Sequence, residues 1–162
     1  MPRVYKTVRI AYETKKWLND IITKCEEQLK KEKESLVIEC EDKLRKSDKF
    51  KNYSPTLSLS VSSGSIVEAA YYYSKSLNLS SVDWLKIAEE SKIEAKNELK
   101  QYGSLDVGSI TPRFFIGTDV LDGLEKMQWE LKPDTMQRNL QLNYILKLII
   151  YCYYKHICKK DA

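Results

Sequence analysis

The strongest constraint on the fold is an internal similarity between two segments of this chain. Residues 8–14 align with residues 114–120, and at the same offset Leu18, Asn19 and Ile21 align with Leu124, Glu125 and Met127. In each copy an extended stretch leads into an acidic helix start, a helix, a break and a second, capped helix. A similarity that also preserves the order of elements predicts that one supersecondary unit occurs twice.

The extended stretch at residues 3–10 alternates between two kinds of side chain. Its apolar face consists of Val4, Val8 and Ile10, and its polar face carries Tyr5, Thr7 and Arg9. A period of two residues is typical of a strand with one buried face. The second copy, residues 109–117, places Thr111, Arg113 and Phe115 on its outward face. It also contains Pro112, which a strand tolerates only where the missing N–H is not required.

A long helix is predicted directly after the first strand. From Glu13, apolar residues recur at steps of three and four, and charges of both signs fill the opposite face through Lys33. No glycine or proline interrupts residues 6–53. The helix therefore either bends near Ser35 or continues past three further apolar residues, Leu36, Cys40 and Leu44.

Four more helices are predicted downstream. The serine-rich segment 62–65 caps one of them, with Ser65 and Glu68 at the spacing of a capping box. Another begins after Ser81 and continues to Gln101. The second copy contains a helix over residues 119–131 and a final apolar helix, whose cap is Asp134 or Thr135. The predicted fold class is mainly α with a short two-stranded antiparallel β-ribbon.

The composition is that of a helix-rich globular protein. The chain is 43% hydrophobic and 31% charged with only five glycines and four prolines, which argues against a disordered tail. Its net charge of +4 permits nucleic-acid binding but does not require it. The four cysteines form no CxxC pair, and the first residues lack the apolar stretch of a signal peptide. We expect reduced thiols and a cytoplasmic protein.

No metal, cofactor or membrane partner is expected. Three candidate ligands, Cys152, His156 and Cys158, have a non-standard spacing for a metal site, and His156 is the only histidine. The final helix is apolar almost all round, but Lys147 and Lys155 interrupt it and its apolar run is shorter than the ~20 residues of a membrane span. A buried helix is therefore predicted.

Catalysis is not expected either. The sequence contains no nucleophile–base constellation and no glycine-rich phosphate loop. A metal-dependent nuclease is the enzymatic alternative, through carboxylates that fall partly on one helical face, namely Glu89, Glu90, Glu94 and Glu98. These carboxylates alternate with lysines, however, in the manner of an ordinary solvated helix.

Two segments resemble the ribbon-helix-helix DNA-binding superfamily of the Arc/MetJ type. Residues 6–21 resemble its opening, in which a basic strand runs into a Ser-x-Glu-Thr-like helix start with Leu at this spacing. The sequence Ser-Gly-Ser-Ile-Val-Glu-Ala-Ala at 63–70 is similar to the start of its second helix. The resemblance covers residues 3–30 and 62–78 and extends faintly over 109–154.

The resemblance implies a duplicated domain organisation. Residues 1–78 would form a first ribbon-helix-helix-like half, residues 79–108 a connecting helix and linker, and residues 109–162 a second half. The family has only a short turn between its two helices, whereas residues 33–62 intervene here. We interpret residues 33–62 as a helical and loop insertion that projects from the core, with Leu36, Cys40 and Leu44 on an apolar seam. Its expected role is contact with a partner or additional contact with the DNA backbone through basic residues, namely Lys43, Arg45, Lys46, Lys49 and Lys51.

The implied function is that of a transcriptional regulator that binds double-stranded DNA. Such proteins insert a two-stranded ribbon into the major groove. The residues expected to contact bases are Tyr5, Thr7, Arg9 and Arg113. Those expected to contact phosphates are Arg3 and Lys6 of the strand, Ser63, Gly64 and Ser65 at one helix start, and Thr135 at another.

Other interpretations of the same pattern stay open. A basic strand before a helix is also typical of a hairpin edge whose charges keep it solvated. The scaffold also suits a protein-interaction or virion assembly factor, whose partner is a second copy of the chain or another protein bound through residues 33–62. The strand at 3–10 pairs either with residues 109–117 of the same chain or with its counterpart in a second chain.

Overall fold

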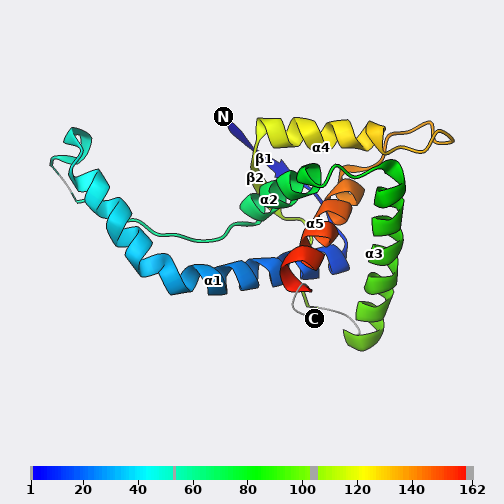
Figure 1. Ribbon diagram of the computed structural model, residues 1–162, viewed down its shortest axis with the longest axis horizontal. Helices are drawn as coiled ribbons and strands as arrows, with labels where there is room; N and C mark the ends of the chain where they lie inside the picture. Colours follow the sequence, from blue (N-terminus) through cyan, green and yellow to red (C-terminus); the bar gives the residue numbers. More distant parts are fainter. Residues whose placement is uncertain (1, 53, 103–105, 160–162) are drawn as a thin grey trace.

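The computed structural model describes residues 2–52, 54–102 and 106–159 and contains mainly helices with one small sheet (Figure 1). Its elements in chain order are β1 (Arg3–Thr7), α1 (Tyr12–Arg45), a 3-10 helix (Asp48–Phe50), α2 (Ser63–Ser76), α3 (Ser81–Tyr102), β2 (Arg113–Gly117), α4 (Thr118–Glu130) and α5 (Leu142–Cys158). The sheet has two antiparallel strands, so the predicted fold class is confirmed. Residues 103–105 of the predicted linker and 160–162 of the predicted second half lie outside the described residues.

The two strands pair within one chain, in the register Arg3 to Gly117 through Thr7 to Arg113. Backbone bonds extend the ladder past β1, because the N–H of Val8 donates to the carbonyl of Pro112 and that of Ile10 to the carbonyl of Ile110. Pro112 has no N–H with which to return the bond to Val8. Regular pairing therefore ends at Thr7, whereas the predicted strand extended to residue 10.

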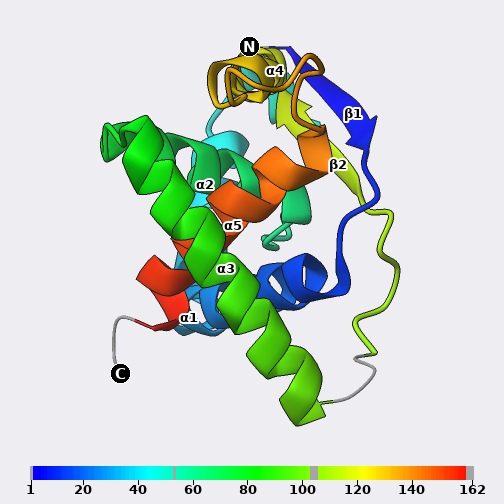
Figure 2. The same ribbon diagram turned by 90° about the vertical axis from the view of Figure 1, so that its right-hand side faces the viewer.

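Helix α5 is the central element of the core. Figures 1 and 2 show it in the middle of the helical body, with α4 above it, α1 below it and α3 across it. Its buried apolar residues lie almost all round the helix, as predicted, and include Ile145, Leu146, Leu148, Ile149 and Ile150. Full burial of each such side chain contributes about 1.5–3 kcal/mol. The two lysines that interrupt the helix are paired, since Lys147 meets Glu13 at 3.0 Å and Lys155 meets Glu90.

Aligned apolar positions of the internal similarity are buried in both halves. The aligned pairs are Ile10 with Ile116, Leu18 with Leu124, and Ile21 with Met127. The largest difference is Trp17, which aligns with Gly123. The Trp17 ring fills the space beside α5, with its centroid 4.8 Å from that of Tyr151 and 6.1 Å from that of Tyr154.

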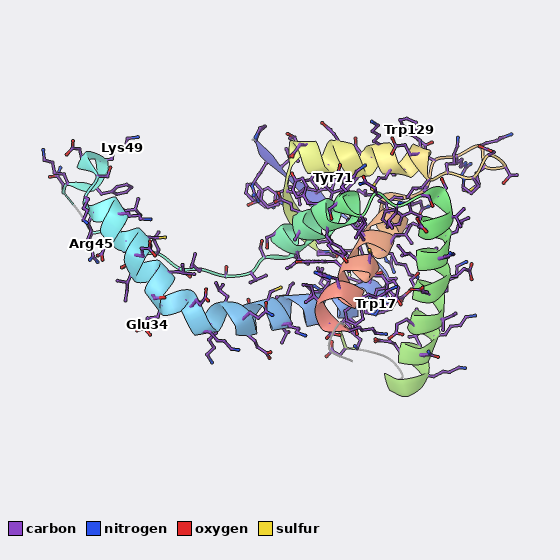
Figure 3. The ribbon with its side chains drawn as sticks, viewed as in Figure 1. Trp17, Glu34, Arg45, Lys49, Tyr71 and Trp129 are labelled. Carbon is purple, nitrogen blue, oxygen red and sulfur yellow. The ribbon has the colours of Figure 1, made fainter. Side chains whose placement is uncertain are left out.

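Helix α1 is continuous and also bends. Figure 3 places Glu34 at the change of direction, where the Oγ of Ser35 donates to the carbonyl oxygen of Glu32 at 3.1 Å. A serine that bonds back to the preceding turn favours such a bend. The buried residues of α1 all precede it, namely Thr14, Trp17, Leu18 and Ile21. Residues 26–52 and 54–60, here called the arm, project from the body (Figure 1). Leu36 and Cys40 are exposed and Leu44 is half-buried, so the three do not form the expected apolar seam.

The predicted cap of α2 within segment 62–65 is confirmed, whereas the predicted capping box and the predicted start of α5 are wrong. Helix α2 is capped by Ser62, whose Oγ accepts from the N–H of Ser65 at 3.2 Å, and the expected partner Glu68 pairs with Arg3 at 2.7 Å instead. Helix α5 begins at Leu142 rather than after Asp134 or Thr135.

The late start of α5 has a long-range cause. The N–H of Leu140 donates to the carbonyl of Gln128 at 3.0 Å, and the Gln128 side chain donates back to the carbonyl of Leu140 at 2.8 Å. These bonds hold the connecting segment against α4 in a non-helical conformation. Thr135 consequently lies in an exposed turn between the two helices. No helix among the described residues is long and apolar enough to cross a membrane.

Candidate nucleic-acid interface

One face of the β-ribbon is exposed and carries polar and aromatic side chains. It carries Arg3, Tyr5 and Thr7 from β1 and Arg113 and Phe115 from β2, and Arg9 and Thr111 are exposed just beyond the paired residues. The opposite face is covered by the helices, with Phe114 and Ile116 fully buried and Val4 and Lys6 half-buried. The structure thus brings the four residues expected to contact bases, Tyr5, Thr7, Arg9 and Arg113, onto one outward face.

Arginines and aromatic rings alternate across this face. Tyr5 lies opposite Phe115 in the ladder, with ring centroids 4.7 Å apart. The guanidinium carbon of Arg113 lies 3.9 Å from the Tyr5 centroid, and that of Arg3 lies 5.9 Å from the Phe115 centroid. Each such contact contributes about 0.5–1 kcal/mol at an exposed site. The sequence alone could not reveal this stack, because it depends on the register between distant strands.

The two arginines differ in what else they contact. Arg3 pairs with Glu68 at 2.7 Å, so its charge is neutralised locally. Arg113 has no ion-pair partner among the residues that the structure describes. Its guanidinium carbon lies over the Tyr5 ring, which leaves its N–H groups available for the bidentate recognition that arginine uses.

The N-terminus of α2 lies against β2. A Cβ atom on Gly64 would stand 2.5 Å from the carbonyl oxygen of Phe115 and 2.9 Å from its nitrogen, so only glycine allows this approach. Ser65 is exposed, but its N–H is already donated to Ser62. Three residues of this helix start were expected to contact phosphates. Gly64 is buried, whereas Ser63 is half-buried and its N–H, the first of the helix, is not used by the Ser62 cap.

The N-terminus of α5 lies at the end of β1. A hollow of about 360 Å³ lies between the strand, α4 and the start of α5. The strand side contributes Lys6, Thr7, Val8 and Arg9, α4 contributes Glu125 and Gln128, and the start of α5 contributes Gln141, Leu142 and Asn143. Gln141 makes no side-chain cap, so first-turn N–H groups of α5 are available. Sequence reasoning assigned this role to Thr135, which the structure places elsewhere. The start of the apolar run at Leu142 was the sequence signal that marks the first residue of α5.

The four carboxylates of the nuclease alternative are each paired with a lysine. Glu89 meets Lys92 at 3.6 Å, Glu94 meets Lys159 at 2.8 Å, Glu98 meets Lys16 at 3.1 Å, and Glu90 meets Lys155. Burial opposes the charge of Lys16, but Asp20 and Glu98 outweigh it and raise the pKa of that amine. Three of these pairs join α3 to α1, to α5 or to Lys159 just after α5, which gives their carboxylates a structural role.

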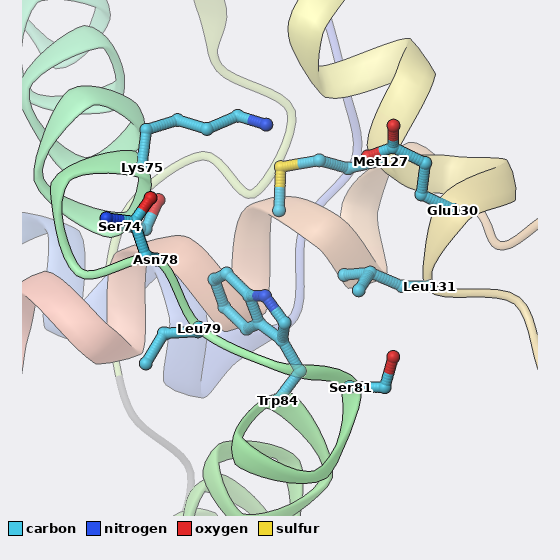
Figure 4. A pocket seen from close by; sticks show the side chains of 9 residues that line it. All are labelled: Ser74, Lys75, Asn78, Leu79, Ser81, Trp84, Met127, Glu130 and Leu131. Atoms are coloured by element: carbon cyan, nitrogen blue, oxygen red, sulfur yellow. The ribbon is translucent and has the colours of Figure 1, made fainter.

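The candidate metal ligands of the sequence have other surroundings. Within the described ranges no group of three or more His, Cys, Asp or Glu side chains is placed to hold a metal ion. His156 stacks on Tyr73 with centroids 4.3 Å apart, and burial raises the pKa of the Cys152 thiol. A cavity of about 290 Å³ lies where α2, α3 and α4 meet (Figure 4). There Trp84 and Met127 face each other, with Lys75 and Glu130 at the rim.

Comparison with protein-family models, with curated proteins and with solved structures finds no match to this chain. The likeness to ribbon-helix-helix proteins stays a prediction from the quoted motifs.

Proposed function

We propose that this protein is a DNA-binding transcriptional regulator, not an enzyme, which inserts its β-ribbon into the major groove. One observation carries the proposal: the exposed ribbon face presents Tyr5, Thr7 and Arg113 together, and the N-termini of α2 and α5 lie beside its two strands. A two-stranded ribbon fits the major groove, which is roughly 12 Å wide.

The side chains of the ribbon suit base edges. The free edge of Arg113 matches the O6 and N7 acceptors of guanine, and Thr7 can contact a thymine methyl group. Tyr5 supports the guanidinium plane at 3.9 Å, so less side-chain freedom is lost when Arg113 binds. Arg9, exposed beyond the end of β1, extends the same face.

Phosphates are bound beside the ribbon. A helix N-terminus offers unpaired N–H groups and the positive end of the helix dipole, both favourable for an anion. Ser63 of α2 and Leu142 and Asn143 of α5 supply these groups on the two sides of the ribbon. At the hollow beside α5, the two cations Lys6 and Arg9 outnumber the one carboxylate of the lining, Glu125. Such contacts fix the register of the protein on DNA, and the ribbon supplies sequence preference.

The test is to select a preferred duplex from a random pool and to compare Arg113→Ala with Arg138→Ala. Both arginines are exposed, and both changes remove one positive charge, but Arg138 lies in the segment between α4 and α5. We expect Arg113→Ala to lose about 1–3 kcal/mol of discrimination at one base pair. Arg138→Ala should keep the full preference. Equal weakening by both variants on every sequence, or wild-type binding without salt dependence, would contradict the proposal.

A protein-binding role is the second candidate, and one surface favours it. On the face of α3 turned away from α5, Val82, Leu85 and Ile93 are 61%, 63% and 59% exposed. Apolar side chains gathered on one helix face favour contact with a second copy or another protein. Saturable self-association together with no retention on DNA at low salt would favour this candidate over the first.

A further inference from the structure

The excess positive charge of this protein is concentrated in nine residues at the far end of the arm. Residues 43–51, here called the basic tip, contain one acidic residue, Asp48, and five basic ones: Lys43, Arg45, Lys46, Lys49 and Lys51. The whole chain has 27 basic and 23 acidic side chains, so the rest of it carries 22 of each. Since the rest of the chain has equal numbers of positive and negative charges, the basic tip is the region to which an anion is attracted.

Part of this charge has a structural explanation. Lys43 and Arg45 lie in the last turn of α1, where cations complement the helix dipole, and they pair with Glu39 at 3.3 Å and Asp42 at 3.3 Å. The other three lysines lie beyond the last residue of α1 and are exposed, namely Lys46, Lys49 and Lys51. None of the three has an ion-pair partner within the described part of the chain. Their mutual repulsion is relieved when an anion binds.

The arm carries these lysines well away from the body. The 20 residues of α1 that follow Cys25, the last one packed against the core, span roughly 30 Å along the bent helix. One helical turn of B-DNA has a similar length of about 34 Å. Figure 1 shows the ribbon at the edge of the body past which the arm extends, and Figure 3 shows Arg45 and Lys49 at its far end, level with the ribbon in this view.

The shaft that supports the tip has the opposite charge. Residues 26–42 contain seven carboxylates and three lysines. The segment that follows the tip contacts this shaft, because the N–H of Leu57 donates to Oε1 of Glu41 at 3.0 Å. A polyanion is therefore attracted to the tip and repelled by the shaft. This pattern favours a second, separate point of contact over continuous wrapping.

We infer that the basic tip binds the phosphate backbone of DNA outside the segment that the ribbon contacts. The inference rests on the proposed function, since it assigns a second contact to the same duplex. The arm belongs to the first half of the chain alone, so the additional contact lies on one side of the ribbon site. Its footprint on DNA extends by about one helical turn on that side, without preference for sequence.

The test compares two triple variants of the full chain on the duplex selected above. The first is Lys46→Gln, Lys49→Gln and Lys51→Gln; the control is Lys30→Gln, Lys31→Gln and Lys33→Gln on the shaft, with the same change in charge. Binding is titrated across salt concentrations, and the protected region is mapped by hydroxyl-radical cleavage. We expect the tip variant to reduce the slope of log K against log salt by about 2–3, since each phosphate contact contributes about 0.9. The footprint should shorten on one side only.

The outcomes separate this inference from the proposed function. If the tip variant keeps the wild-type slope and footprint while Arg113→Ala loses sequence preference, the inference is wrong and the proposed function stands. If the shaft control changes the slope as much as the tip variant does, the effect is one of overall charge and the inference is also wrong. If wild-type protein does not bind DNA, both fail. Far-ultraviolet circular dichroism of each variant checks that α1 stays folded.

Discussion

Gly64 is the residue on which the contact between α2 and the ribbon depends. The Cβ of an alanine would meet backbone atoms of Phe115, which cannot rotate away as a side chain can. We expect Gly64→Ala to destabilise the protein by about 1–3 kcal/mol, the usual loss on overpacking, as measured by urea unfolding.

Helix propensity alone predicts the opposite sign, because alanine is favoured over glycine within a helix by up to about 1 kcal/mol. A gain in stability would therefore show that α2 does not approach β2 so closely. Gly117→Ala is a useful comparison, since its Cβ would come within 2.5 Å of the Asp119 side chain, which can move. We expect a smaller loss of stability for that variant.

The contact between Tyr72 and Asp119 makes stability depend on pH. The Tyr72 hydroxyl donates to Oδ2 of Asp119 at 2.6 Å and lowers the pKa of that carboxyl below its ordinary 3.8. A carboxyl whose pKa is lower in the folded state than in the unfolded chain stabilises the folded protein at pH values above the unfolded-state pKa. This stabilisation is lost as the pH falls through the folded-state pKa. Tyr72→Phe should therefore destabilise the protein at pH 7 and raise the pKa of Asp119.

Carboxyl chemical shifts measured by NMR during an acid titration report that pKa directly. Urea unfolding of wild type and Tyr72→Phe should differ at pH 7 and converge once Asp119 is protonated in both. A difference that is the same at pH 7 and pH 2 would mean that Tyr72 acts through packing rather than through the charge of Asp119.

Among the elements, the arm is expected to be dispensable for folding. The buried residues of α1 end at Ile21, whereas Val61 packs on the core and Ser62 caps α2. Replacement of residues 34–58 by a flexible Gly-Ser linker should leave the thermal midpoint within roughly 5 °C of wild type, since surface changes are typically within 0.5 kcal/mol. Scanning calorimetry measures this. Loss of a cooperative transition would show that residues 34–58 belong to the core.

The elements also show how far the sequence determines this fold. A period of two residues predicted the outward face of both strands, and a period near 3.6 predicted the helices, because both patterns record burial at short range. The start of α5 was missed since Leu140 is held by Gln128, twelve residues away in the chain. The stack of Arg113 on Tyr5 was missed for the same reason, as it needs the strand register.

At the scale of the whole molecule, the register of the ribbon has a special centre. Thr7 lies opposite Arg113, and these two residues are also aligned with each other in the internal similarity. In a ribbon made of two identical chains, the two-fold axis passes where a residue meets its own counterpart. We propose that the chain is a pseudo-dimer whose approximate axis passes between Thr7 and Arg113, and in which two different residues meet at the centre.

This arrangement predicts a folded monomer with an asymmetric DNA site. Because β1 and β2 pair within one chain, light scattering at micromolar concentration should give the mass of one chain, 18.9 kDa. The ribbon face carries Thr7 on one side of its centre and Arg113 on the other, so the selected duplex should not be a palindrome. Thr7→Arg places the same side chain on both sides of the centre and should shift the selected sequences toward a palindromic central step. If the wild-type protein is instead a strict dimer and selects palindromes, the strands pair between chains. The pseudo-dimer would then be wrong, although DNA binding would remain.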